Sequence, residues 1–174
     1  MTELSVAYYT HASTAVGPLL IAGDRCSLMA IKFDVEVYQI AREVERLYDE
    51  LRQRFVLERD DARMAGVVQQ VVDYVEGKRT KFKLSLDLSF LTPFQQAVLL
   101  ECARIPRGEI ASYAELARRV GKPLAFRAVG NTMRINPIPI VIPCHRVVAS
   151  DGIGGYGGGL AVKRQLLALE GVSI

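Results

Sequence analysis

Three prolines within seven residues, Pro137, Pro139 and Pro143, restrict this chain more tightly than any other feature of its sequence. Each proline fixes its own φ and lacks an amide donor, so the apolar run INPIPIVIPCHRVV cannot be an ordinary central strand. Pro143 also holds Ile142 out of the helical region. The run therefore predicts a stiff, extended segment that leads to Cys144 at the start of whatever element follows.

Cys144 is a candidate nucleophile, because His145, one of only two histidines, follows it directly. Amide donors and an imidazole can lower a thiol pKa from about 8.5 and so raise the fraction of reactive thiolate. A small buried packing residue is the alternative, and for a cysteine among Ile and Val it is the commoner role. Glu170 is a candidate orienting group, since a helix C-terminus disfavours an acid that has no other task. An exposed surface glutamate is the alternative there.

The first 88 residues predict a small antiparallel three-stranded sheet with helices. Three β-like runs, SVAYYT, GPLLIAG and SLMAIKF, are separated by turn residues. Apolar residues then recur every three or four positions over 35–55, and again after Asp60-Asp61 up to the stop at Gly77, which predicts two amphipathic helices. KFKLSLDLSF alternates with a period of two and predicts an extended segment up to a domain boundary near Ser89.

Residues 89–174 predict a second, mostly helical domain, so the expected fold class is α+β with domains at 1–88 and 89–174. Thr92-Pro93 is typical of a helix start. Farther on, a capping box at Ser112 and a glycine stop at Gly121 delimit a short helix, and another runs from Leu124 to about residue 134. Such a pair indicates a helix-turn-helix, winged-helix-like unit. Two helices that merely pack together are the alternative.

The basic charge lies in the second half of the chain. Residues 1–88 hold 12 Lys/Arg and 14 Asp/Glu, a net −2, whereas residues 89–174 hold 10 Lys/Arg and 5 Asp/Glu, a net +5. An anionic partner, nucleic acid first, is the leading interpretation, and a solvated basic face is the alternative. On the second short helix, one polar face and two small side chains would allow close approach to a nucleic acid. The polar face consists of Arg127, Asn131 and Arg134, and the two small residues are Ala128 and Gly130.

Other features exclude several classes of protein. The cysteines Cys26, Cys102 and Cys144 have no CxxC spacing, so neither a disulfide framework nor a metal is expected. No stretch approaches the roughly 20 apolar residues that span a bilayer, and no basic leader opens the chain, which predicts a cytoplasmic protein with no membrane partner. DGIGGYGGGL satisfies GxGxxG but lacks the later acidic residue of a dinucleotide site. We interpret it as a packed loop in which Tyr156 forms a pocket wall, with no cofactor.

The segments SYAELA, FRAVGNTMRINPIPIVIPCHRVVASDG and YGGGLAVKRQLLALEG closely resemble the O6-alkylguanine-DNA alkyltransferases, or methylated-DNA–protein-cysteine S-methyltransferases. The similarity is dense over 92–172, and PCHRV is a highly specific motif. It implies a direct-reversal DNA repair protein that flips O6-alkylguanine, and O4-alkylthymine, out of double-stranded DNA. The alkyl group then passes irreversibly to Cys144 in a single turnover. The resemblance also implies minor-groove binding by a monomer, and cooperative binding on DNA is left open.

The resemblance also assigns roles to individual residues. Cys144 is the nucleophile and alkyl acceptor, His145 the base through a bridging water, and Glu170 the group that orients His145. Tyr113 would donate a proton to the leaving purine and help to rotate the nucleotide, and Arg127 would fill the gap in the stack. Further implied residues are the hinge Asn136, the DNA-contacting Phe126, Ala128, Gly130, Asn131 and Arg134, and the base-pocket residues Met133, Tyr156 and the backbone of Val147 and Gly157.

The sequence departs from the usual pattern at three positions. Phe126 and Asn131 are larger than the residues common on this helix, and Gly157 stands where a serine is frequent, so DNA affinity and alkyl size are open. A Cys-His hydrolase or acyltransferase is one alternative. A lesion-binding protein without the cysteine is another, which the presence of Cys144 argues against. A plain helix-turn-helix transcription factor would leave PCHRV without a purpose.

Overall fold

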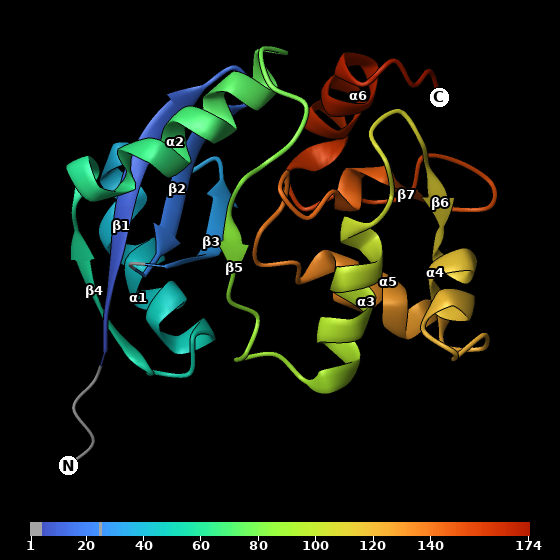
Figure 1. Cartoon of the computed structure of the whole chain (residues 1–174), viewed down its shortest axis with the longest axis horizontal. Helices are drawn as coiled ribbons and strands as arrows, with labels where there is room; N and C mark the ends of the chain where they lie inside the picture. The colour runs from blue at the N-terminus through green and yellow to red at the C-terminus, as the bar shows by residue number, and fades with distance from the viewer. Residues whose placement is uncertain (1–4, 25) are drawn as a thin grey trace. The chain divides into compact units, whose positions relative to one another are not determined.

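The computed structural model describes residues 5–24 and 26–174. The chain divides into two compact units, Met1–Phe90 and Leu91–Ile174 (Figure 1), and each contains buried hydrophobic residues. The architecture is α+β: the first unit is built on a sheet, and the second consists mainly of helices.

A five-stranded mixed sheet forms the centre of the first unit. The three predicted strands are present as an antiparallel meander of β1 (Ser5–Thr14), β2 (Gly17–Gly23) and β3 (Ser27–Phe33). Two edge strands extend this meander. β4 (Phe55–Arg59), which was not predicted, pairs in parallel with β1, and β5 (Ser85–Leu86), within the predicted extended segment, pairs in parallel with β3. The prediction of a purely antiparallel three-stranded sheet is therefore incomplete. The order is β4-β1-β2-β3-β5.

Helices cover both faces of this sheet. On β1, Tyr9 packs with the cluster of Leu20 and Ile40, whereas the next residue, Thr10, donates a hydrogen bond of 2.7 Å to Asp61 Oδ1. Because successive side chains of a strand point to opposite faces, α1 (Ile40–Glu50) and α2 (Asp61–Val75) lie on opposite sides.

The first of these helices is shorter than the predicted span of 35–55. It is preceded by the 3₁₀ turn η1 (Val37–Gln39), and it ends before Arg52 and Gln53, which adopt positive φ values of 57° and 54°. L-residues rarely adopt this conformation, which cannot continue a right-handed helix. The chain therefore turns back at this point, and the last residues of the predicted helix begin β4 instead.

The second unit packs three short helices together and adds a fourth after the glycine-rich loop. Two-residue strands, one before α4 and one after the Cys144 turn, form a parallel pair. The elements are α3 (Pro93–Ala103), β6 (Ala111–Ser112), α4 (Tyr113–Arg119), α5 (Phe126–Arg134), the 3₁₀ turn η2 (Cys144–Arg146), β7 (Val147–Val148) and α6 (Gly159–Leu169).

Two predicted helix starts in this unit are confirmed by their caps. Thr92 Oγ1 accepts the Gln95 amide at 3.3 Å, and Ser112 Oγ accepts the Glu115 amide at 3.1 Å. In both cases the third helical residue bonds back to the cap, which satisfies two orphan donors reciprocally. α4 ends before Gly121, whose φ of +70° suits a glycine. α5 starts two residues later than predicted, at residue 126.

The proline-rich run is not extended throughout, as the sequence had predicted. Ile140 has a φ of +72°, and the Ile142 amide donates to the Ile138 carbonyl at 2.9 Å, so the run contains a tight turn. A positive φ at a β-branched residue costs on the order of 1–3 kcal/mol and persists only where the surroundings enforce it. Ile140 is buried, as are its neighbours Ile138 and Ile142, so core packing holds the turn that precedes Cys144.

Candidate active site

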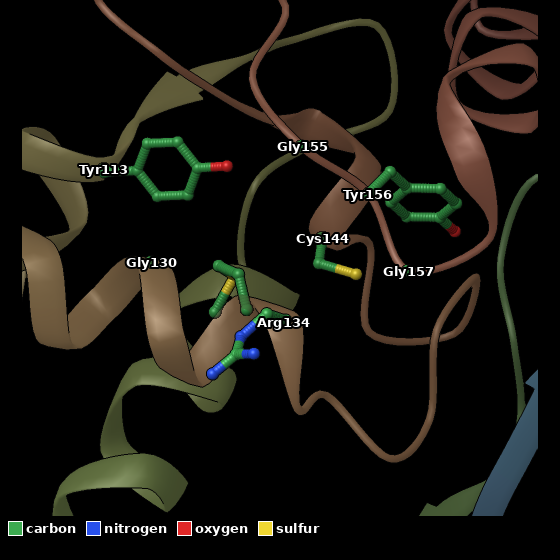
Figure 2. Close-up of a pocket in the computed structure, with 8 residues that line it drawn as sticks. Tyr113, Gly130, Arg134, Cys144, Gly155, Tyr156 and Gly157 are labelled. Atoms are coloured by element: carbon green, nitrogen blue, oxygen red, sulfur yellow. The ribbon is translucent and has the colours of Figure 1, made fainter.

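One cavity of about 340 Å³ brings together several of the residues that the sequence had singled out. This volume is at the small end of the range for small-molecule sites. Figure 2 shows Tyr113 from the start of α4 on one side of Cys144 from η2, and Tyr156 and Gly157 of the glycine-rich loop on the other, with Gly130 and Arg134 of α5 below them. The lining residues are Tyr113, Gly130, Met133, Arg134, Cys144, Gly155, Tyr156 and Gly157.

Cys144 is only 6% exposed, and its sulfur accepts a hydrogen bond of 3.0 Å from Asn136 Nδ2. The same amide nitrogen donates to the Ile142 carbonyl at 3.0 Å, so Asn136 joins the end of α5 to the Cys144 turn. Burial raises the pKa of the Cys144 thiol to about 11, although the Asn136 hydrogen bond and the charge of Lys163 act in the opposite direction. The predicted lowering of this pKa is therefore wrong, because desolvation of the thiolate outweighs its neighbours.

His145 is fully buried and is held by a carboxylate. Its Nε2 lies 2.6 Å from Glu170 Oε1. A carboxylate can only accept, so Nε2 carries the proton and Nδ1 is left as the acceptor of the neutral ring. Burial lowers the pKa of His145, opposed by the hydrogen bond to Glu170. Nδ1 has no hydrogen-bond partner among the described protein atoms, so the ring is an oriented base with its basic nitrogen available.

Glu170 is buried rather than exposed, and the cationic side chain of Arg146 also holds it. Arg146 donates from Nε to Glu170 Oε2 at 2.8 Å and from Nη2 to Oε1 at 3.0 Å. A third guanidinium donor, Nη1, reaches the Ile105 carbonyl at 2.5 Å. Such a bidentate pair sets the plane of the carboxylate as well as its charge. Arg146 was not predicted as the partner of Glu170.

Tyr113 is a neutral donor beside the glycine-rich loop. The pKa of its phenol is raised, mainly by burial, so the hydroxyl keeps its proton at neutral pH. A Cβ at Gly154 would lie 3.0 Å from Tyr113 Oη, and Gly154 has a φ of +71°. Only glycine fits both conditions, so this residue lets the loop approach the phenol. The closely packed loop was predicted, but this particular glycine was not.

Lys163 is a functional candidate that the sequence analysis missed. Its side chain is fully buried, and Nζ donates to the Val147 carbonyl at 2.7 Å and to the Gly155 carbonyl at 3.1 Å. It thereby ties the strand after Cys144 to the pocket loop. The available signal was a lysine three and four residues before Leu166 and Leu167, within the apolar face of α6. Burial lowers the pKa of Lys163 to about 8.

The structure places two of the expected pocket residues, Val147 and Gly157, in different surroundings from each other. Gly157 lines the cavity, but Val147 does not: it is fully buried in β7, and its carbonyl is bonded to Lys163. Met133, also an expected lining residue, is present in the cavity wall and is 7% exposed. Tyr156 places its ring edge-on to that of His145, with 6.3 Å between the centroids.

The exposed face of α5 matches the predicted contact residues in position. Gly130 and Arg134 lie both on this helix and in the cavity wall, so the helix surface continues into the pocket. Val129 and Met133 face the core. The exposed residues of the helix are Phe126, Arg127, Ala128, Asn131 and Arg134.

Within residues 5–24 and 26–174, no group of three or more His, Cys, Asp or Glu side chains could hold a metal ion. His11 Nε2 lies 2.7 Å from the Val35 carbonyl, and Cys26 is exposed. In the same part of the chain, no helix combines the length and apolar character that crossing a membrane requires.

Comparison with known proteins defines the class. Residues 93–172 match the family model described as "6-O-methylguanine DNA methyltransferase, DNA binding domain", and residues 7–88 match "6-O-methylguanine DNA methyltransferase, ribonuclease-like domain". The chain belongs to the 6-O-methylguanine DNA methyltransferase family.

Individual relatives agree over nearly the whole chain. The methylated-DNA–protein-cysteine methyltransferase of Mycobacterium tuberculosis is 38% identical over 94% of this chain and 92% of its own length. That of Methanosarcina barkeri is 39% identical over 94% and 96%. The crystal structure of Mycobacterium tuberculosis OGT in complex with DNA superposes with a TM-score of 0.78, at 36% identity over 94% of this chain and 92% of that one.

Proposed function

We propose that this protein repairs DNA by moving an alkyl group from guanine O6 to its own Cys144, once and irreversibly. The observation that carries the proposal is a buried cysteine in a cavity with a phenol donor, followed in sequence by a histidine that a buried glutamate orients. The relatives named above are methylated-DNA–protein-cysteine methyltransferases, and one neighbouring structure holds DNA.

The residues divide the reaction into balanced steps. His145 Nδ1 takes the Cys144 proton through a bridging water, while Glu170 and Arg146 hold the ring. The thiolate attacks the alkyl carbon, the S–C bond forms, and the C–O bond breaks with its electron pair going to the purine. Tyr113 hydrogen-bonds the departing purine and supplies its proton, which the imidazolium replaces. Guanine thus gains one proton for the one that the thiol loses, Tyr113 and His145 return to their starting protonation, and the thioether has no route back.

Access to the target atom requires base flipping. Guanine O6 lies within the base stack, so extrusion costs a few kcal/mol. We assign α4 and α5 to a helix-turn-helix in a winged-helix-like unit that docks in the minor groove of double-stranded DNA. Arg127 enters the stack in place of the lesion, and the small residues Ala128 and Gly130 permit close approach. O4-alkylthymine is a second substrate under this proposal.

The two units divide the work. Residues 89–174 carry every residue assigned to DNA binding or alkyl acceptance, and they hold the net positive charge. Residues 1–88 act as a support domain. The acting species is a monomer, because the assigned reaction draws on no residue from a second chain.

Intact-mass spectrometry after incubation with an O6-methylguanine duplex tests the proposal. We expect one added methyl group per chain, mapped to the peptide that contains Cys144, and no further turnover. Cys144→Ala should bind the duplex without any mass change, and Cys26→Ser, which alters an exposed cysteine, should react as the wild type does. Catalytic turnover beyond one equivalent would favour the hydrolase or acyltransferase reading instead.

A further inference from the structure

An exposed apolar pair lies at the start of α5, beside Arg127. Phe126 is the first residue of the helix and is 46% exposed, and Leu124, just before it, is 90% exposed. Single exposed hydrophobic residues are common, but adjacent ones that form a patch can mark an interaction surface. Neither has a role in the mechanism above, which uses Arg127, Ala128 and Gly130 from this helix.

We infer that Phe126 is a second intercalating residue, which wedges into the base step next to the one that Arg127 fills. This inference rests on the proposed function, because it takes α5 as the element that enters the minor groove. The Arg127 guanidinium carbon lies 6.0 Å from the centroid of the Phe126 ring, so the two side chains are neighbours at the helix start. Together they present a cation and a flat apolar surface.

The position of the ring relative to the pocket favours this role. Phe126 and Gly130 are four residues apart, so they lie on one face of α5. Gly130 belongs to the cavity wall. The ring is therefore one helical turn from the cavity, on the face that leads into it. A base leaving the stack toward Cys144 would pass beside this face.

The surroundings identify the partner as nucleic acid rather than protein. Between Glu115 and Asp151 the chain has no acidic residue, whereas it has six basic ones. Five of these are exposed, Arg118, Arg119, Lys122, Arg127 and Arg134, whereas Arg146 is buried and paired with Glu170. A nucleic acid combines anionic phosphates with flat bases that can stack, so it is complementary to an exposed aromatic ring within a basic segment. Proteins that bind the minor groove use such wedges to unstack base steps, and aromatic rings stack on every base.

Phe126→Ala is the direct test. We expect its alkyl transfer from an O6-methylguanine duplex, at subsaturating DNA, to be slower by about tenfold, the order that loss of one base–aromatic stacking contact produces. Reaction with free O6-benzylguanine, which needs no flipping, should change less than twofold. Leu160→Ala, which truncates a residue of α6 that is 45% exposed, should leave both rates unchanged.

Two further measurements separate stacking from folding defects. In a Cys144→Ala background, 2-aminopurine placed beside the lesion should fluoresce more strongly on binding, and Phe126→Ala should reduce that increase. Phe126→Trp should keep both the duplex rate and the fluorescence change. Equal duplex rates for wild type and Phe126→Ala, or a Trp variant as slow as the Ala variant, would overturn the inference. Failure of the wild type to accept a methyl group from the O6-methylguanine duplex would instead refute the proposed function.

Discussion

At the scale of single residues, the site keeps both reacting groups uncharged at rest. Burial is the largest cause of two opposite shifts: it raises the pKa of Cys144 and lowers that of His145. A thiolate–imidazolium pair is therefore disfavoured before substrate arrives. The neutral thiol is a poor nucleophile toward stray electrophiles, which protects an acceptor that can be used only once.

The raised thiol pKa predicts the pH dependence of Cys144 labelling. The rate with iodoacetamide, followed on the peptide containing Cys144, should rise about tenfold per pH unit from pH 7 and level off only near pH 11, since the thiolate is the reactive form. Because the folded pKa lies above the unfolded one, the associated stability is present below about pH 8.5 and is lost as the pH rises toward 11. A plateau by pH 8 would contradict the assignment.

At the scale of elements, a capping box and a short pair of strands position the residues of the site. The capping box of Ser112 and Glu115 starts α4, so that Tyr113 is its first residue. The parallel pair of β6 and β7 joins the segment before α4 to the segment after Cys144. α4 is only seven residues long, and so short a helix depends on its cap and its packing more than on propensity.

Ser112→Ala should destabilise the second unit by about 1 kcal/mol, because the Glu115 amide loses its acceptor. Urea denaturation followed by circular dichroism at 222 nm measures this change as a lower midpoint. Ser173→Ala, at an exposed serine outside every helix, is the matched control and should not alter the midpoint. An unchanged midpoint for Ser112→Ala would show that packing alone defines the start of α4.

At the scale of the whole molecule, charge separates the two halves of the chain. Residues 89–174 have a net charge of +5, and residues 1–88 have −2. Neutralising DNA phosphates releases counterions, so the affinity of this protein for DNA should depend on salt.

We predict that Cys144→Ala protein binds an O6-methylguanine duplex at least roughly a hundredfold more weakly at 200 mM than at 50 mM salt. Fluorescence anisotropy of the labelled duplex measures the effect. Wild-type reaction with free O6-benzylguanine, which involves no phosphates, should be nearly independent of salt and serves as the control. Salt-independent duplex binding would remove the electrostatic part of the proposed interface.

Much of this protein could be read from local sequence. N-caps set the helix starts at Thr92 and Ser112, and a glycine stop sets the helix end before Gly121. The groups that satisfy a helix end lie within a few residues of it. β-like runs separated by turn residues placed β1 to β3, a helical period placed α2, and the PCHRV segment singled out Cys144 as the candidate nucleophile. Each of these depends on neighbours along the chain.

The tertiary structure alone decided the rest. β4 pairs with β1 about 50 residues earlier, so no local pattern revealed it. The turn at Ile140 is held by core packing. Glu170 accepts hydrogen bonds from His145 and Arg146, about 25 residues away in the sequence. Lys163 donates to the carbonyls of Val147 and Gly155. The protonation of Cys144 follows from burial, which exists only once distant segments have closed over the sulfur and removed the water that would stabilise its charge.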